Sequence, residues 1–260
     1  MLAHERYDII MKVLEKNKII KVAEIMEKFN ISVETVRRDL EYLEKQGLLK
    51  RIYGGAIYAK ESDIEPEYPI RKKTNIDEKK SIGIKAAELI EDNDTIILDI
   101  GTTPLQVAKN IKHKKNITVL TNSLLIINEL ANSDVKIHVL GGTLRINELS
   151  MSGPITLYAL EQFHVDKAII GAGGITINQG ISDYIVEEAV VRKKIIERAE
   201  KIIVVADYSK FGVNSFASVC PIKSVDVIVT DWNVSNKLIK EYKDKGIEII
   251  RAEKPELMDN

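Results

Sequence analysis

Residues 32–40 read SVETVRRDL, and this stretch decides how the first part of the chain is interpreted. The hydroxyl of Ser32 can accept a free backbone N–H at the start of a helix, so Ser32 is the expected N-cap. At the period of a helix, Val36 and Leu40 fall on one apolar face, and the residues between them face outward. The sequence therefore predicts a helix over about 33–46 that presents polar side chains in its first turns.

Two further helical patterns precede this helix, over about 4–16 and 21–29. The stretch that follows, GLLKRIYGGAIYA (47–59), indicates two short strands around Gly54 and Gly55. Two helices joined by a short turn, with polar groups near the start of the second, form a helix-turn-helix. A hairpin after it predicts a winged helix, with Lys50 and Arg51 beside the backbone of a bound duplex.

Charge alone does not decide whether this module binds DNA. Residues 1–58 hold 11 Lys and Arg against 9 Asp and Glu, a net charge of +2, and the whole chain has a net charge of −1. Polyanion binding must then come from a local patch, and a module for protein contacts fits the same balance. Glu34 and Arg38 are spaced as a helical ion pair. Asp39 lies beside the apolar face, which predicts an ion pair within the domain instead of a contact with DNA.

Residues 5–56 carry a resemblance that favours DNA. They resemble the N-terminal domain of the DeoR family of bacterial transcription regulators, through S-x-x-T-V-R-R-D-L (32–40) and R-x-Y-G-G-A (51–56). The resemblance implies that helix 33–46 is the recognition helix, whose guanidinium groups bind phosphates or a guanine edge. The DNA-binding residues expected on this basis are Ser32, Glu34, Thr35, Arg37, Arg38, Lys50, Arg51 and Tyr53.

The remaining chain predicts a polar linker and a second domain. Residues 59–80, AKESDIEPEYPIRKKTNIDEKK, are polar and broken by prolines, which is typical of a linker or arm between a domain at 1–58 and one at 81–260. After it, helical patterns alternate with continuously apolar runs, as expected for a mostly parallel α/β sheet buried on both faces. The predicted strands are 95–100, 117–121, 135–140, 167–172, 201–206, 225–230 and 247–251.

Five clusters of small and polar residues follow predicted strands. Ligands of open α/β sheets bind beyond the carboxyl ends of the strands, and a loop that opens a helix there favours an anion such as phosphate. Each cluster alone is more often a turn, and none matches a nucleotide-binding motif. The predicted effector-binding residues are Asp99, Gly101, Thr102, Thr103, Thr121, Asn122, Ser123, Gly141, Gly142, Gly171, Gly173, Gly174, Asp207 and Lys210.

The order of these clusters also resembles the effector domain of the DeoR family. D-x-G-T-T (99–103), T-N-S (121–123), G-G (141–142) and D-x-S-K-F-G (207–212) occur in that order. The resemblance implies a fold like ribose-phosphate isomerases and CoA transferases. It further implies a phosphorylated sugar or related metabolite as effector, operator DNA as partner, and a homo-oligomeric repressor.

Other classes of protein are disfavoured. One cysteine and four scattered histidines predict no metal site, no motif predicts a cofactor, and no apolar run is long enough to span a membrane, so a cytoplasmic protein is expected. GAGGITINQGIS (171–182) offers no acid that could serve as the general base of an isomerase. The alternative is a sugar-phosphate isomerase-like enzyme with an N-terminal assembly module. In the helical pattern over about 183–201, Arg192 is expected on the solvated face.

Overall fold

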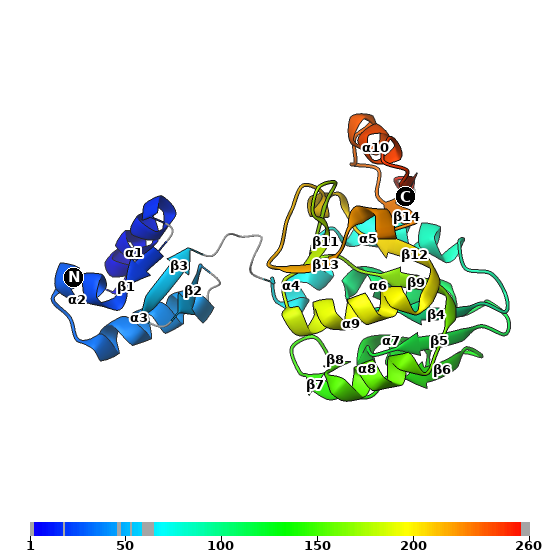
Figure 1. Cartoon of the computed structure of the whole chain (residues 1–260), viewed down its shortest axis with the longest axis horizontal. Coiled ribbons are helices and arrows are strands. Elements are labelled where there is room, and N and C mark those ends of the chain that lie inside the picture. Colours follow the sequence, from blue (N-terminus) through cyan, green and yellow to red (C-terminus); the bar gives the residue numbers. More distant parts are fainter. Residues whose placement is uncertain (1–2, 18, 46–47, 53, 59–64, 256–260) are drawn as a thin grey trace, which may run out of the picture. The chain divides into compact units, whose positions relative to one another are not determined.

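The computed structural model describes residues 3–17, 19–45, 48–52, 54–58 and 65–255. The chain divides into two compact units, Met1–Pro66 and Glu67–Asn260 (Figure 1). Each unit has a hydrophobic core of its own, so each is a separate folding problem.

The first unit is a three-helix fold with a small antiparallel sheet. Its elements are α1 (Ala3–Asn17), β1 (Ile19–Lys21), α2 (Val22–Phe29), α3 (Val33–Lys45), β2 (Leu49–Ile52) and β3 (Gly55–Tyr58). The strand order is β1-β3-β2. The predicted winged helix-turn-helix is confirmed, and β1 is an addition that the sequence did not predict. The apolar faces of the helices meet in one core made of Ile10, Leu14, Ile25, Val36, Leu40 and Leu43.

Both glycines of the hairpin have a conformational reason. Gly54 has φ of 82°, a left-handed conformation that side chains other than glycine rarely adopt. A Cβ on Gly55 would lie 2.2 Å from the carbonyl oxygen of Ile20, because Gly55 is paired with Lys21 of β1 in the same antiparallel sheet. The G-G pair thus lets the hairpin turn and lets β1 join it.

The second unit is built on a seven-stranded sheet. Its strands are β4 (Thr95–Leu98), β5 (Thr118–Thr121), β6 (Lys136–Val139), β9 (Val165–Ile170), β12 (Ala199–Val205), β14 (Val227–Thr230) and β15 (Glu248–Arg251). They pair in the order β15-β14-β12-β9-β4-β5-β6, and every pair is parallel. Each strand lies within one of the predicted apolar runs or overlaps it, so the predicted parallel α/β sheet is confirmed.

The strand order reverses at the middle of the sheet. The chain runs outward from β4 to β5 and β6, returns to β9 on the other side of β4, and continues to β12, β14 and β15. The loops after β4 and β9 therefore diverge from each other. This topological switch point is where open α/β sheets bind ligands.

Helices cover both faces of the sheet, which explains the continuously apolar strands. Ile96 and Leu98 of β4 pack on one side with α5 (Ile76–Ala87), α6 (Thr102–Asn110) and α7 (Leu124–Leu130). Ile97 packs on the other side with α8 (Pro154–Glu161), α9 (Val186–Glu197) and α10 (Asn236–Lys243). Successive side chains of a strand thus enter two different cores.

Two small antiparallel sheets were not predicted. The hairpin of β7 (Thr143–Arg145) and β8 (Ser150–Ser152) follows β6, and β10 (Gly174–Thr176), β11 (Gly180–Asp183) and β13 (Ala217–Cys220) form a three-stranded sheet. Short 3₁₀ turns occupy Tyr208–Lys210 and Ile222–Ser224. Within the described part of the chain, no helix has the length and hydropathy of a membrane span.

Residues 67–80 differ from the predicted linker. They hold α4 (Tyr68–Lys73) and the start of α5, and they belong to the second unit. Pro69 lies in the first turn of α4, where the missing N–H is not needed for an intrahelical hydrogen bond. Proline here starts a helix, whereas the sequence was interpreted as broken by it.

Candidate functional site

The hydroxyl of Ser32 caps the N-terminus of α3. The backbone N–H of Thr35 donates to Ser32 Oγ (3.3 Å), and the two hydroxyl oxygens lie 3.1 Å apart. Ser32 is therefore the N-cap that the sequence predicts. Ser32 is exposed and Thr35 is half-buried, so this pair lies at the surface of the helix N-terminus.

Asp39 forms the intradomain ion pair that its position predicts. Arg6 Nε donates to Asp39 Oδ2 (2.7 Å) and Arg6 Nη2 donates to Asp39 Oδ1 (2.8 Å). The Asp39 carboxylate raises the pKa of Arg6, mainly through these hydrogen bonds. Asp39 is 3% exposed, so it connects α3 to α1 and is not available to DNA.

The two adjacent arginines of α3 are exposed. Among the residues that the structure describes, neither Arg37 nor Arg38 has an ion-pair partner, so the predicted pair between Glu34 and Arg38 is not formed. The helix buries Val36 and Leu40 while it leaves both guanidinium groups in solvent. That is the arrangement required of side chains that bind a polyanion.

The wing contributes less positive charge than the sequence suggests. Arg51 Nε donates to Glu44 Oε2 (2.6 Å) and the Arg51 backbone N–H donates to Glu44 Oε1 (2.8 Å), so Glu44 neutralises this arginine. Glu44 raises the pKa of Arg51 by the same contact. Lys50 lies in β2, but its side chain and the whole of Tyr53 lie outside the described residues.

In the second unit, the five predicted clusters lie at one edge of the sheet. They follow β4, β5, β6, β9 and β12, which are consecutive in the strand order β12-β9-β4-β5-β6. Parallel strands end at the same edge, so the structure brings the clusters together as predicted. Whether each residue binds a ligand is a separate question, which depends on what its polar atoms already contact.

The cluster after β4 opens a helix at the switch point. Gly101 (φ 122°) precedes α6, and the first intrahelical bond runs from Leu105 N to Gly101 O (3.2 Å). The N–H groups of Gly101, Thr102 and Thr103 precede that bond, and Pro104 has no N–H to satisfy. This helix N-terminus has the polarity that attracts an anion.

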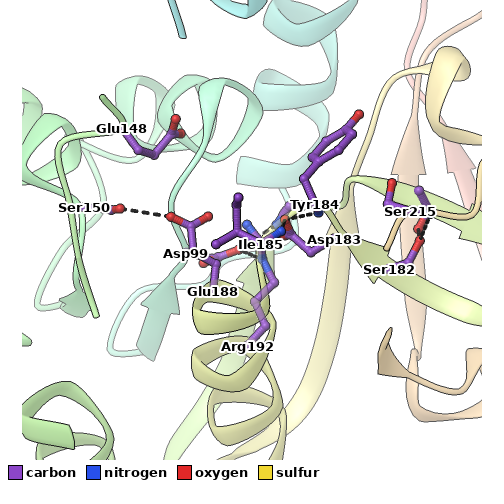
Figure 2. A network of polar contacts seen from close by, with 12 residues as sticks. Asp99, Glu148, Ser150, Ser182, Asp183, Tyr184, Ile185, Glu188, Arg192 and Ser215 are labelled. Atoms are coloured by element: carbon purple, nitrogen blue, oxygen red, sulfur yellow. Dashed lines mark hydrogen bonds and ion pairs between the residues drawn. The ribbon is translucent and has the colours of Figure 1, made fainter. Parts of the chain in front are cut away.

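Asp99 forms an ion pair with Arg192, a buried arginine that was expected to be exposed to solvent. Arg192 of α9 is 5% exposed, which corrects its predicted place on the solvated face. Its Nε donates to Asp99 Oδ2 (2.5 Å), and its Nη1 forms an ion pair with Asp183 (Figure 2). Asp99 Oδ2 also accepts the N–H of Gly171 (3.1 Å), so the loops after β4 and β9 are joined across the switch point.

A second buried carboxylate on α9 extends this network toward the β7–β8 hairpin. Glu188 Oε1 accepts from Arg145 Nη1 (2.5 Å) and from the hydroxyl of Ser150 (3.1 Å). Glu188 is 4% exposed, so α9 presents charged groups to the interior at both Glu188 and Arg192. Figure 2 shows Asp99 close to Glu188 and Arg192, which both belong to α9.

The T-N-S segment after β5 is largely structural, with one exception. Ser123 Oγ accepts the N–H of Ile126 (3.3 Å) and caps α7, and Thr121 Oγ1 accepts the N–H of Ser123 (3.1 Å). Asn122 Nδ2 donates to Met151 O (2.8 Å). Asn122 Oδ1 is buried and has no hydrogen-bond partner among the described residues, so it is an acceptor available for a ligand.

Close packing accounts for some of the predicted glycines. A Cβ on Gly142 would lie 2.2 Å from Thr156 Oγ1, and one on Gly174 would lie 2.3 Å from Val213 O. Gly173 also meets backbone, with Asp183 Cα at 3.0 Å, whereas Gly141 and Gly171 have ordinary contacts. The structure thus explains three of these glycines by neighbouring protein atoms.

The cluster after β12 carries the remaining charges. Asp207 Oδ1 accepts from Asn75 Nδ2 (3.0 Å), from Ser209 N (3.0 Å) and from the Ser209 hydroxyl (2.5 Å). Lys210 Nζ lies 3.3 Å from the Tyr184 hydroxyl and 5.5 Å from the centre of its ring. Lys210 is half-buried whereas Asp207 is buried, so Lys210 is the more exposed of these two charged residues.

Lys79 is a residue of this region that the sequence analysis missed. It is 5% exposed, and its Nζ donates to the carbonyl oxygens of Arg71 (2.6 Å) and Thr74 (2.8 Å). Burial lowers the pKa of Lys79 to about 8, and Asp207 opposes this shift. The available signal was its spacing, because Lys79 lies on the same helical face as the buried Ile82 and Ala86.

Comparisons with known proteins agree with both units. The DeoR-like helix-turn-helix domain model matches residues 6–62, and the DeoR C-terminal sensor domain model matches residues 74–232. The HTH-type transcriptional regulator GolR of Listeria innocua is 31% identical over 97% of this chain and 100% of its own. The glycerol-3-phosphate regulon repressor of Escherichia coli is 34% identical over 87% of this chain and 90% of its own.

A third relative covers the whole length. The HTH-type transcriptional repressor GlcR of Bacillus subtilis is 34% identical over 100% of both chains. Among solved structures, ribose-5-phosphate isomerase A of Neisseria gonorrhoeae is 21% identical over 52% of this chain and 53% of its own, with a TM-score of 0.40. With a helix-turn-helix at its N-terminus and the matching sensor domain after it, this chain belongs to the DeoR family of transcriptional regulators.

Proposed function

We propose that the chain represses an operon of sugar or sugar-phosphate metabolism, and that a phosphorylated sugar or related metabolite relieves or changes this repression. DNA is bound through the N-terminal end of α3 (Val33–Lys45), and the effector is bound at the carboxyl edge of the seven-stranded sheet. The protein acts on chromosomal DNA, which places it in the cytoplasm. The observation that carries the proposal is the exposed Arg37–Arg38 pair on a helix whose opposite face forms the core of the domain.

The chemistry of α3 supports DNA as the partner. Arg37 and Arg38 have no ion-pair partner among the described residues, so neither guanidinium has to leave a carboxylate before it meets a phosphate or a guanine edge. Arg51 differs, because it must leave Glu44 first. We therefore assign the main contacts to α3 and an auxiliary role to the wing.

A single α3 helix covers little DNA, which argues for an oligomer. Helix-turn-helix proteins reach useful affinity by placing two reading helices on half-sites about one helical turn apart. The first unit has a net charge close to zero, so long-range attraction adds little to the affinity of one head. We propose a homo-oligomer that presents at least two heads.

The effector site is proposed at the topological switch point. The N-terminus of α6 at Gly101–Thr103 offers free N–H groups for a phosphate, and Asn122 Oδ1 offers a buried acceptor for a hydroxyl. Lys210 adds a positive charge at the same edge. The name of one relative, the glycerol-3-phosphate regulon repressor, fits an effector of this chemical class.

Binding without turnover fits the carboxylates of this region. An isomerase needs a carboxylate that is free to take a proton from its substrate. Asp99 and Asp183 are both in an ion pair with Arg192, and Asp207 Oδ1 already accepts three hydrogen bonds. Asp99 and Asp183 are therefore committed to positioning the loops, and Oδ1 of Asp207 is committed to Asn75 and Ser209.

Two measurements on one protein sample test the proposal. Operator binding is measured by fluorescence anisotropy with the promoter of the neighbouring operon, at low and high salt. Glycerol 3-phosphate, ribose 5-phosphate and glucose 6-phosphate are then added, with glycerol, ribose and glucose as controls. We expect binding that weakens with salt, and a change in affinity with a phosphorylated compound but not with its parent.

Matched variants connect the effect to the proposed site. Thr102→Val removes a hydroxyl beside the α6 N-terminus and should weaken the effector response. Thr118→Val makes the same change at the amino end of β5 and should leave the response as in wild type. If the wild-type chain does not bind the operator in any condition, the proposed DNA binding is refuted. If sugars with and without phosphate change the operator affinity equally, the proposed sensing of a phosphorylated compound is refuted.

A further inference from the structure

We propose that α4 and the two residues after it, Thr74 and Asn75, transmit effector binding to the DNA-binding unit. This inference rests on the proposed effector site and adds how that site is regulated. The transmission uses two side chains, Asn75 and Arg71. They attach the start of the second unit to residues at the carboxyl edge of the seven-stranded sheet.

The first support is the place of α4 in the chain. The second unit begins at Glu67, and α4 (Tyr68–Lys73) is its first helix. Every residue of the DNA-binding unit precedes it. Any change that travels along the covalent chain from the candidate effector site to α3 therefore has to pass through α4.

Asn75 attaches this segment to a residue of the candidate effector site. Its Nδ2 donates to Asp207 Oδ1 at 3.0 Å, and Asp207 is 2% exposed. The same oxygen accepts from the N–H and the hydroxyl of Ser209. A carboxylate oxygen has few acceptor positions, so a ligand hydroxyl that donates to Oδ1 of Asp207 has to displace one of these donors.

Arg71 attaches the segment to a second part of the same edge. It forms an ion pair with Glu148, which is 3% exposed and lies in the turn between β7 and β8. Residues 149–151, which follow Glu148, pair with the T-N-S segment and with the first residue of α7. Leu124 N donates to Leu149 O (2.9 Å), and Met151 N donates to Asn122 O (2.8 Å). A ligand that moves Asn122 therefore also moves the acceptor of Arg71.

Lys79 makes the segment respond as one piece. Its Nζ binds the carbonyl oxygens of Arg71 and Thr74, and so clamps the last turn of α4 and the joint after it to α5. The two attachments at Asn75 and Arg71 are thus coupled. Releasing one changes the alignment of the other.

The joint between α4 and α5 is a suitable hinge. Thr74 is extended (φ −70°, ψ 131°) and Asn75 is left-handed (φ 51°, ψ 40°). A left-handed conformation is unfavourable for residues other than glycine, and asparagine adopts it where its side chain has a local hydrogen bond. Loss of the Asp207 contact removes part of what holds it, so the direction of α4 changes most easily at this residue.

The chain offers a closely matched control for Asn75. Asn116 is also left-handed (φ 58°), and its Nδ2 also donates to a side-chain oxygen, that of Asn93 at 2.9 Å. Asn116 precedes β5, so it lies at the amino edge of the sheet, away from the effector site. Asn75→Gly and Asn116→Gly each delete one such bond and relieve the same backbone strain.

The experiment measures coupling in the full chain. Operator affinity is determined with and without saturating glycerol 3-phosphate, ribose 5-phosphate or glucose 6-phosphate, using the compound that changes wild type most. Binding of that compound is followed separately through the fluorescence of Trp232, the single tryptophan, which follows Asp231 at the same edge. We expect wild type and Asn116→Gly to show a change of roughly 5- to 150-fold, and Asn75→Gly to show less than about 2-fold.

Three results would overturn the inference. If Asn75→Gly and Arg71→Met each keep the wild-type ratio of affinities, α4 transmits nothing. Asn75→Gly losing binding of the compound itself makes Asn75 a ligand contact and not a coupling residue. Wild type failing to respond to all three compounds refutes the proposed sensing, and the inference falls with it; this failure is distinguishable because it occurs before any substitution.

Discussion

Replacing Asp39 by alanine tests whether the recognition stretch separates structure from DNA contact, residue by residue. Asp39 and Arg38 are neighbours in α3, yet the Asp39 carboxylate is buried against Arg6 whereas the Arg38 side chain is exposed. Asp39→Ala removes the hydrogen bonds that Arg6 Nε and Nη2 donate to Asp39, and the Arg6 side chain is only 12% exposed. Arg38→Ala removes no contact within the domain that the described residues show.

The size of the effect follows from burial. Removing one partner of a buried ion pair costs about 3–5 kcal/mol, and we take about 3 kcal/mol because Arg6 can turn partly into solvent. At about 0.05–0.15 kcal/mol per residue, a unit the size of Met1–Pro66 has a free energy of unfolding of roughly 3–10 kcal/mol. The substitution therefore removes between a third and all of the stability of this unit. A loss of that size lowers its melting temperature by roughly 12–24 °C.

The assay is thermal unfolding of the full chain, with hydrogen exchange of α3 amides to assign the transition. Asp39→Ala should melt the first unit earlier and leave the transition of the second unit in place, and operator affinity should fall with the folded fraction. The double variant Arg6→Met, Asp39→Leu should restore stability, because an apolar pair of similar volume replaces a buried ion pair well. If Asp39→Ala melts like wild type and still loses operator binding, Asp39 contacts DNA and the assignment is wrong.

Three further predictions concern single residues. Arg38→Ala should abolish most operator binding with unchanged melting, and an unchanged salt slope in its residual binding would mean that α3 docks in another way. Lys210→Ala should weaken the effector response and spare operator affinity without effector, as titration of both ligands will determine. Burial lowers the pKa of Lys79 from 10.5 to about 8. Between these two pH values the unfolded chain binds more protons than the folded chain, so the free energy of unfolding rises with pH. Below about pH 8 the cost of burying the charged Lys79 is fully present. Lys79→Met should remove that rise in denaturant unfolding measured across the window, and a slope equal to that of wild type contradicts it.

The sequence predicted the sheet well because its signal is local. Strands buried on both faces are runs such as TIILDI (95–100) and KIIVVA (201–206), and each shows its nature within six residues. The short strands β7, β8, β10, β11 and β13 lack such runs. Strand β13 exists because it pairs with the distant β11, as Ser218 does with Ser182, and a local pattern does not contain that information. Strands β7, β8, β10 and β11 belong to hairpins, but strands of three or four residues are too short to show a pattern of their own.

The candidate site divides in the same way. Asp39 was placed correctly because its position beside an apolar face requires a partner, and Ser32 because capping is a local rule. Arg192 was placed wrongly, since its partners Asp99 and Asp183 lie on other elements and only the fold brings three charges into one buried cluster. The glycines were predicted as effector-binding residues, and close packing explains Gly142, Gly173 and Gly174 without a ligand.

The position of β4 beside β9 has a consequence for the chain during its synthesis. The core of the first unit is complete once β3 ends at Tyr58, whereas β4 gains its partner on one side only after Ile170 has emerged from the ribosome. At about 5–20 residues per second, this interval lasts roughly 6–22 s. A nascent chain thus carries a folded DNA-binding unit before its effector-binding unit has folded. If one head binds DNA weakly, as we propose, the need for a second completed copy keeps unfinished chains from silencing an operon that they cannot yet release.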